Sequence, residues 1–131
     1  MAPFNLKMVV FAAILVCMKF HSSVGDVNIV GDDKGWMVPN DPKFYDNWQS
    51  KDIFRMNDQL VFNFKTGSQD VAIVDKEGYD KCKPNPRYII KRGPAIVNLT
   101  EPGWYYFICS FKNHCKHYQK LAVYVIFDGS K

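Results

Sequence analysis

The sequence contains no internal repeat, no low-complexity stretch and no large excess of charge of either sign. Its seventeen basic and thirteen acidic side chains leave a formal net charge of +4 over 131 residues. This small, scattered excess gives no argument for nucleic-acid binding, and the composition excludes disorder, collagen and coiled coil. The length is that of one globular domain with a single hydrophobic core.

The sequence also lacks the motifs of the common catalytic sites. It has no glycine-rich phosphate-binding loop, and no motif connects a serine with His114 or His117. We therefore expect that the protein is not an enzyme.

Long apolar runs are absent except for one near the N-terminus. Lys7 precedes an unbroken apolar run from Met8 to Met18, and Ser23-Val24-Gly25 supplies small residues before a cleavage point. This pattern predicts a secretory signal peptide over residues 1–25 and a domain over residues 26–131. The run is shorter than the roughly 20 residues of a membrane span. With no hydrophobic tail at the C-terminus, we expect a secreted, soluble protein without a membrane anchor.

Cysteines are few, and their number after the predicted cleavage is odd. Cys82, Cys109 and Cys115 remain in residues 26–131. In an oxidising compartment two of the three should pair, which leaves one thiol for a separate purpose.

Short alternating apolar runs separated by turn residues predict a β-rich fold. Strands are expected at residues 27–30, 60–64, 71–74, 95–99, 104–109 and 121–127. Residues 36–57 are less regular and are compatible with a short helix or a loop. The aromatic content of 15% suits a β-rich core. The pattern indicates an all-β sandwich of the Greek-key type.

The segment from Cys109 to Gln119 concentrates potential metal ligands. A thiol at the end of a predicted strand is followed five residues later by His114, and Gln119 follows five residues after that. A thiolate with imidazole in a trigonal array, plus a weak axial Met or Gln, is the ligand set of a blue-copper electron-transfer site. The segment therefore indicates a candidate site for one copper ion.

Residues 27–127 resemble the phytocyanins, which are plant blue-copper-like proteins with a cupredoxin fold. The resemblance is carried by Val30-Gly31-Asp32, Gly35-Trp36, Tyr45 with Trp48, Phe54 with Asp58, Leu60-x-Phe62-x-Phe64, Tyr79-x-x-Cys82 and Tyr106-Phe-Ile-Cys109-x4-His114-Cys115. It implies a cupredoxin-like Greek-key β-sandwich with Trp36, Trp48 and Trp104 in its core.

The same resemblance implies specific roles for the cysteines and for the candidate ligands. It implies a disulfide between Cys82 and Cys115, and Cys109 as the copper thiolate. His114 and an axial Gln119 complete the retained ligands, and an axial glutamine resembles the stellacyanin branch. A one-electron carrier of the extracellular space, apoplast or cell wall is the implied function, with an unknown redox partner.

The sequence departs from the family pattern at one ligand. The family's His-Asn-Val-Val-like stretch reads Gln69-Asp70-Val71-Ala72, so Gln69 stands where an equatorial imidazole is expected. Changes around metal ligands already lower affinity about 10–100-fold, and loss of a ligand should cost more. We therefore expect copper binding to be weakened or lost. His117 is a possible substitute ligand, or an ordinary solvated residue of the loop.

Two other interpretations stay open at this point. Cys109, His114, Cys115 and His117 have a spacing compatible with zinc, although secretion favours a disulfide for Cys115. Alternatively, the sandwich is a non-metal interaction module that binds a cell-wall polymer, a receptor or a small ligand. Neither interpretation requires more than a monomer.

Asn98-Leu99-Thr100 is the one glycosylation sequon of the sequence. It lies at the end of a predicted strand, directly before a turn. In a secreted chain we expect a glycan on Asn98.

Overall fold

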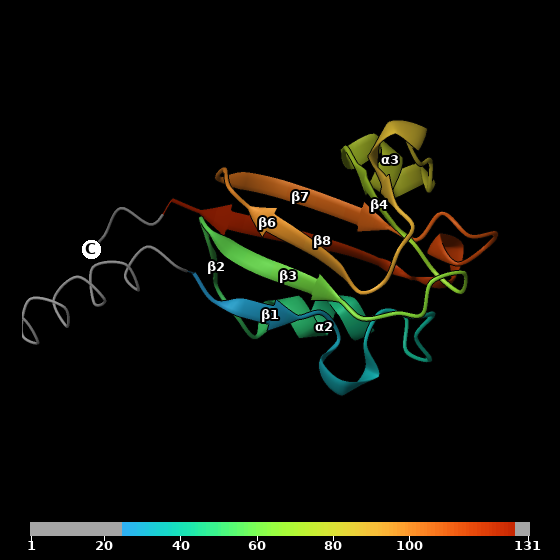
Figure 1. The fold of residues 1–131 in the computed structure, drawn as a ribbon, viewed down its shortest axis with the longest axis horizontal. Coiled ribbons are helices and arrows are strands. Elements are labelled where there is room, and N and C mark those ends of the chain that lie inside the picture. The colour runs from blue at the N-terminus through green and yellow to red at the C-terminus, as the bar shows by residue number, and fades with distance from the viewer. Residues whose placement is uncertain (1–24, 128–131) are drawn as a thin grey trace, which may run out of the picture.

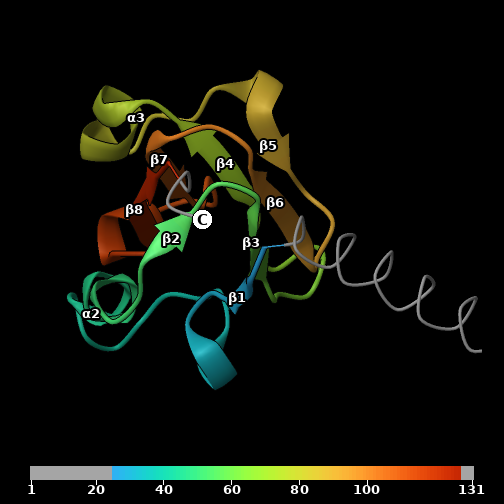
Figure 2. The same ribbon diagram turned by 90° about the vertical axis from the view of Figure 1, so that its left-hand side faces the viewer.

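The computed structural model describes residues 25–127 as two β-sheets packed face to face (Figures 1 and 2). The first sheet has three strands in the order β1 (Val27–Ile29), β3 (Asp58–Phe62) and β6 (Ala95–Leu99). The second has five, in the order β2 (Phe54–Arg55), β8 (Lys120–Ile126), β7 (Gly103–Ile108), β4 (Val71–Val74) and β5 (Ile89–Ile90). This arrangement confirms the expected β-sandwich.

Period-2 alternation decides which side chains fill the space between the sheets. Along β3 the side chains of Asp58, Leu60 and Phe62 are buried, and along β6 those of Ala95, Val97 and Leu99 are buried. Aromatic rings join the layers, because Phe62 contacts both Trp36 and Phe107 with ring centroids 4.9 and 5.1 Å apart. The core is therefore continuous from the first sheet to the second.

Two α-helices of the described residues lie outside the sheets. Helix α2 (Phe44–Ser50) falls in the region 36–57, where a short helix was one of two expectations, and it buries Tyr45 and Trp48. Helix α3 (Lys76–Lys81) follows β4 and was not predicted, because its six residues are too few for a helical period. Strands β2 and β5 were also missed, because two residues are too few to show the alternation of a strand.

The expected strand boundaries hold with small shifts and one misplaced side chain. Residues 71–74 and 95–99 form strands as predicted, whereas Phe64 lies beyond the end of β3. Trp36 and Trp48 are buried, but the expectation that Trp104 lies in the core is wrong, since Trp104 is 58% exposed. In β7 the alternation turns Phe107 inward and leaves Trp104 on the outer face of the sheet.

The predicted signal peptide lies outside the described residues, apart from Gly25. Within residues 25–127, no helix has the length and apolar character needed to cross a membrane.

Candidate metal centre

The loop between β7 and β8 holds the candidate ligands at one end of the sandwich (Figure 1). Cys109 directly follows β7 and Gln119 directly precedes β8, and the Cys109 amide donates to the carbonyl oxygen of Gln119 at 3.1 Å. Within the loop, the Gln119 amide donates to the carbonyl oxygen of His114 at 3.0 Å. The antiparallel pairing of the two strands thus closes the loop and brings its ends together.

Pairing between β4 and β7 brings Gln69 to the same place. Ala72 lies opposite Ile108 in antiparallel register, so the residues before β4 run beside the residues after β7. Asp70 is buried there, and its carboxylate accepts hydrogen bonds from the amide of Ser110 at 2.7 Å and from the Ser110 hydroxyl. This contact fastens the segment that carries Gln69 to the segment that carries Cys109.

Three of the candidate groups converge. Gln69 Oε1 lies 2.9 Å from His114 Nδ1 and 3.6 Å from Cys109 Sγ. Cys109 Sγ lies 3.5 Å from His114 Nδ1, which closes the triangle. An amide oxygen only accepts hydrogen bonds, so in this arrangement Nδ1 carries the hydrogen of the imidazole. The Cys109 thiol and the His114 imidazole therefore share Gln69 Oε1 as their hydrogen-bond acceptor.

The amide of Gln119 differs from the other groups because it has no partner. Its side chain is fully buried, and neither Oε1 nor Nε2 has a hydrogen-bond partner among the residues that the structure describes. An unpaired buried amide costs about 1–3 kcal/mol. Such an orphaned acceptor fits a site in which Oε1 coordinates a metal ion.

Burial also controls the protonation of the thiol. The side chain of Cys109 is 1% exposed, and this desolvation raises its pKa to about 11. The thiol is therefore protonated at neutral pH, and Cys109 would have to lose this proton to hold a metal ion as a thiolate.

The disulfide between Cys82 and Cys115 is confirmed, with a Cα–Cα distance of 5.7 Å. It joins the residue after α3 to the loop that contains His114, across a separation of 33 residues. Closing a loop of this length stabilises the fold by about 3–4 kcal/mol on the chain-entropy model. Cys109 remains as the free thiol of the described chain.

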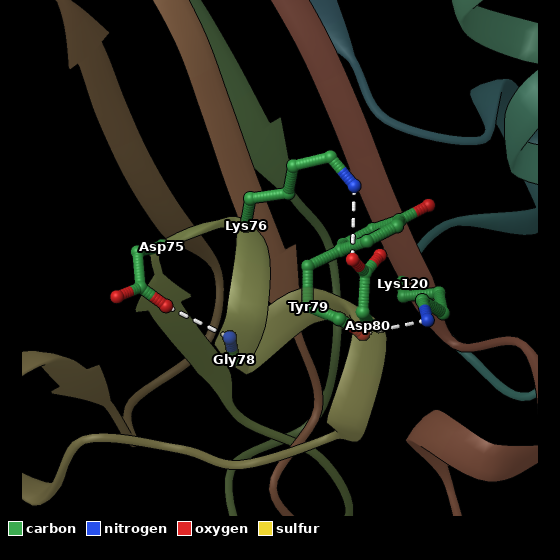
Figure 3. Close-up of polar contacts among 6 residues, drawn as sticks. All are labelled: Asp75, Lys76, Gly78, Tyr79, Asp80 and Lys120. Atoms are coloured by element: carbon green, nitrogen blue, oxygen red, sulfur yellow. Dashed lines mark hydrogen bonds and ion pairs between the residues drawn. The ribbon is translucent and has the colours of Figure 1, made fainter.

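Helix α3 is anchored beside β8, which fixes the position of Cys82 (Figure 3). Asp75 caps the helix by accepting a hydrogen bond from the Gly78 amide at 2.8 Å. Lys120, the residue after Gln119, donates from Nζ to the carbonyl oxygen of Tyr79 at 2.6 Å and lies 4.0 Å from the centre of its ring. Partial burial lowers the pKa of Lys120. The helix, the disulfide and the start of β8 therefore form one connected unit beside the ligand loop.

Comparison with known proteins assigns the chain to a family. A family model described as a plastocyanin-like domain matches residues 36–119. The cucumber peeling cupredoxin of Cucumis sativus is 37% identical over 103 residues, which are 76% of this chain and 75% of that protein. The chain belongs to the phytocyanin family.

Other relatives agree with this assignment. A blue copper protein of Arabidopsis thaliana is 36% identical over 122 residues, which are 92% of this chain but only 59% of that relative. The solved structure of cucumber stellacyanin with Cu²⁺ superposes with a TM-score of 0.75 at 35% identity, covering 81% of this phytocyanin and 99% of stellacyanin. The cupredoxin-like fold implied by the sequence is thus confirmed.

The zinc interpretation of the phytocyanin loop is wrong. Cys115 is bound in the disulfide, so its sulfur is not a thiolate ligand. Within residues 25–127, no three His, Cys, Asp or Glu side chains come together as a metal site. The remaining candidate ligands are the Cys109 thiol, the His114 imidazole and the side-chain amides of Gln69 and Gln119.

His117 takes a position outside this set. It is exposed in the 3₁₀ turn of Cys115–His117, and its Nδ1 lies 2.7 Å from the carbonyl oxygen of Asn113. The structure therefore brings Gln69, Cys109 and His114 together and places His117 on the outside of the loop.

Sequence reasoning missed the two hydrogen bonds that Ser110 donates to the carboxylate of Asp70, which we call the Asp70–Ser110 clamp. Trp36 extends this clamp, because its indole Nε1 donates to the carbonyl oxygen of Asp70 at 2.8 Å. The only sequence signal was position, since Asp70 follows Gln69 and Ser110 follows Cys109.

A cleft of about 350 Å³ opens beside the candidate centre. It is lined by the disulfide, by Cys109 to Asn113 and by Lys116. The ring of Phe111 stacks on that of His114 with centroids 5.6 Å apart. Solvent thus approaches the site past an aromatic ring and two lysines, Lys112 and Lys116.

Proposed function

We propose that this phytocyanin binds a single copper ion through Cys109, His114 and Gln119, and that Gln69 makes this binding weaker than an imidazole would. The convergence of Cys109 Sγ, His114 Nδ1 and Gln69 Oε1 within 3.6 Å carries the proposal. The buried Gln119 amide, which has no hydrogen-bond partner among the described residues, supports it. The relatives named blue copper proteins and the copper-containing stellacyanin support it. Bound copper supplies one-electron transfer, so the protein acts as an electron carrier rather than an enzyme.

Each side chain has a separate task in this proposal. Cys109 loses its proton and provides the soft anionic ligand, which is the ligand type that suits the cuprous state. His114 provides Nδ1, and Gln119 provides a buried amide oxygen that has no hydrogen-bond partner among residues 25–127. The clamp between Asp70 and Ser110 holds the two ligand-bearing segments at a constant separation.

Gln69 lowers the affinity in two ways. It offers a neutral amide oxygen where an imidazole would be a better copper ligand. It also accepts a hydrogen bond from His114 Nδ1, the ring nitrogen that faces Cys109 Sγ and would bind the metal in this proposal. This hydrogen bond, worth about 0.5–1.5 kcal/mol, has to break and its proton has to leave before coordination.

The proposal includes export from the cell. The predicted signal peptide over residues 1–25 supports it, as does the disulfide, because disulfides persist in oxidising compartments. Electron exchange would then take place with a redox partner of the extracellular space.

Copper titration of the secreted protein tests the proposal. We expect a weak but saturable Cu(II)–thiolate absorption in the visible range, which Cys109→Ser abolishes. Gln69→His should raise the affinity at least about tenfold, whereas the surface control Gln49→His should not. Absence of the absorption in both the native protein and Gln69→His would leave the non-metal interaction module as the better explanation.

A further inference from the structure

The outer face of the three-stranded sheet carries an exposed row of apolar side chains. Ile29 of β1 lies opposite Val61 of β3, and Val61 lies opposite Ile96 of β6. Ile29 is 37% exposed and Ile96 is 56% exposed, while Val61 is half-buried. We call Ile29, Val61 and Ile96 the apolar row. Contiguous exposed apolar side chains in a soluble domain usually mark a surface that something covers.

Asn98 lies on the same face as the apolar row. It follows Ile96 by two positions on β6, so both side chains point outward. It is exposed and begins the sequon Asn98-Leu99-Thr100. Any group attached to Asn98 therefore starts beside Ile96.

A hydrogen bond sets the orientation of the Asn98 amide. Gln59, its partner across the strands, donates from Nε2 to Asn98 Oδ1 at 2.9 Å. This bond uses the oxygen of the Asn98 amide and leaves Nδ2, the atom modified in N-glycosylation, for a glycosidic bond.

We propose that Asn98 carries an N-linked glycan whose first sugars lie over the apolar row. The proposal rests on the export that is part of the proposed function. In the transfer, Nδ2 of Asn98 loses a proton and forms a bond to C1 of the sugar. The C1–oxygen bond of a lipid-pyrophosphate-linked oligosaccharide donor breaks, and the lipid pyrophosphate leaves.

The position of β6 favours a glycan over a second copy of the chain as the occupant. Strand β6 is an edge of its sheet, and an exposed edge invites pairing with another chain unless something blocks it. A bulky, solubilising group on Asn98 blocks such an approach. At the same time, the C–H face and acetyl methyl of the first sugar contact Ile96.

The covalent part is tested on the full chain secreted from plant cells. Mass spectrometry of the Asn98 peptide, before and after peptide-N-glycosidase treatment, measures occupancy. We expect a glycan on the native protein and on Thr100→Ser, which keeps the sequon, and none on Thr100→Ala. Native protein secreted without a glycan on Asn98 overturns the proposal, and so does a chain that is not exported.

The covering of the apolar row is tested on the same proteins. Removing the glycan enzymatically from the folded native protein should raise the binding of a hydrophobic dye about twofold or more. Adding Ile96→Ser should abolish this rise. Equal dye binding with and without the glycan overturns the covering, as does dimerisation of the glycosylated protein through this face.

Copper titration of the glycosylated samples separates this proposal from the proposed function. A glycosylated protein that covers Ile96 but binds no copper contradicts the copper site alone. A copper-binding protein without a glycan contradicts the glycan alone.

Discussion

Oε1 of Gln69 lies 2.9 Å from Nδ1 of His114, so the amide occupies the nitrogen that a metal ion would need. The two residues are 45 positions apart in the chain. Their contact gives the site an internal hydrogen bond, while the Gln119 amide has no partner within residues 25–127. Without a metal ion, the His114 imidazole therefore has a hydrogen-bond partner in Gln69, whereas the Gln119 amide has none among the described residues.

Gln119→Met should stabilise the metal-free protein by about 1–3 kcal/mol, because it removes a buried amide that has no partner in the part of the chain that the structure describes. The measurement is urea unfolding in the presence of a copper chelator, with Gln49→Met on α2 as the control. A loss of stability in Gln119→Met would show that the amide has an unseen partner in solution.

Cys82→Ser should destabilise the domain by about 3–4 kcal/mol, because it opens the loop that the disulfide closes. Thiol titration of the unfolded variant should find one more thiol than in the native protein. Cys109→Ser, which leaves the disulfide intact, should instead find one fewer thiol. An unchanged thiol count in Cys82→Ser would contradict the pairing.

The hydrogen bonds between Asp70 and Ser110 should be energetically coupled. Asp70→Ala leaves the Ser110 amide without its carboxylate acceptor, and hydrogen bonds to charged groups contribute about 1.5–3 kcal/mol. A double-mutant cycle with Ser110→Ala, measured by urea unfolding, should therefore be non-additive. Asp52→Ala, at an exposed position, serves as the control. Additive effects of Asp70→Ala and Ser110→Ala would argue against the clamp.

Stability should fall in strongly alkaline solution because of Tyr45. Burial raises its pKa from the ordinary 10.0 to about 12. Folding therefore favours the protonated phenol, and this contribution is complete below pH 10 and lost as the pH rises from 10 towards 12. Tyr45→Phe should flatten the decline of stability in this range, measured by urea unfolding, whereas the exposed Tyr118→Phe should not. A decline of equal slope in both variants would assign the effect to other groups.

Local sequence patterns were sufficient for much of the fold. Strands β4 and β6 begin and end where the sequence predicts. Strand β6 alternates buried and exposed residues, and β4 is a short apolar run bounded by Asp70 and Asp75. Alternation alone did not reveal which face of β7 is inward, since both faces carry aromatic residues. Trp104 was therefore misplaced, and only packing against the first sheet, where Phe107 contacts Phe62, decides that Phe107 is the buried residue.

In the candidate site, too, some features could be predicted from the sequence and others were decided only by the tertiary structure. The odd number of cysteines in residues 26–131 and the spacing from Cys109 to Gln119 could be read from the sequence alone. The spacing is informative because a short loop between two neighbouring strands brings its own ends together. The meeting of Gln69 with Cys109, 40 positions later, was decided only by the tertiary structure. Pairing between β4 and β7 sets this contact, and such pairing depends on the register of two distant strands.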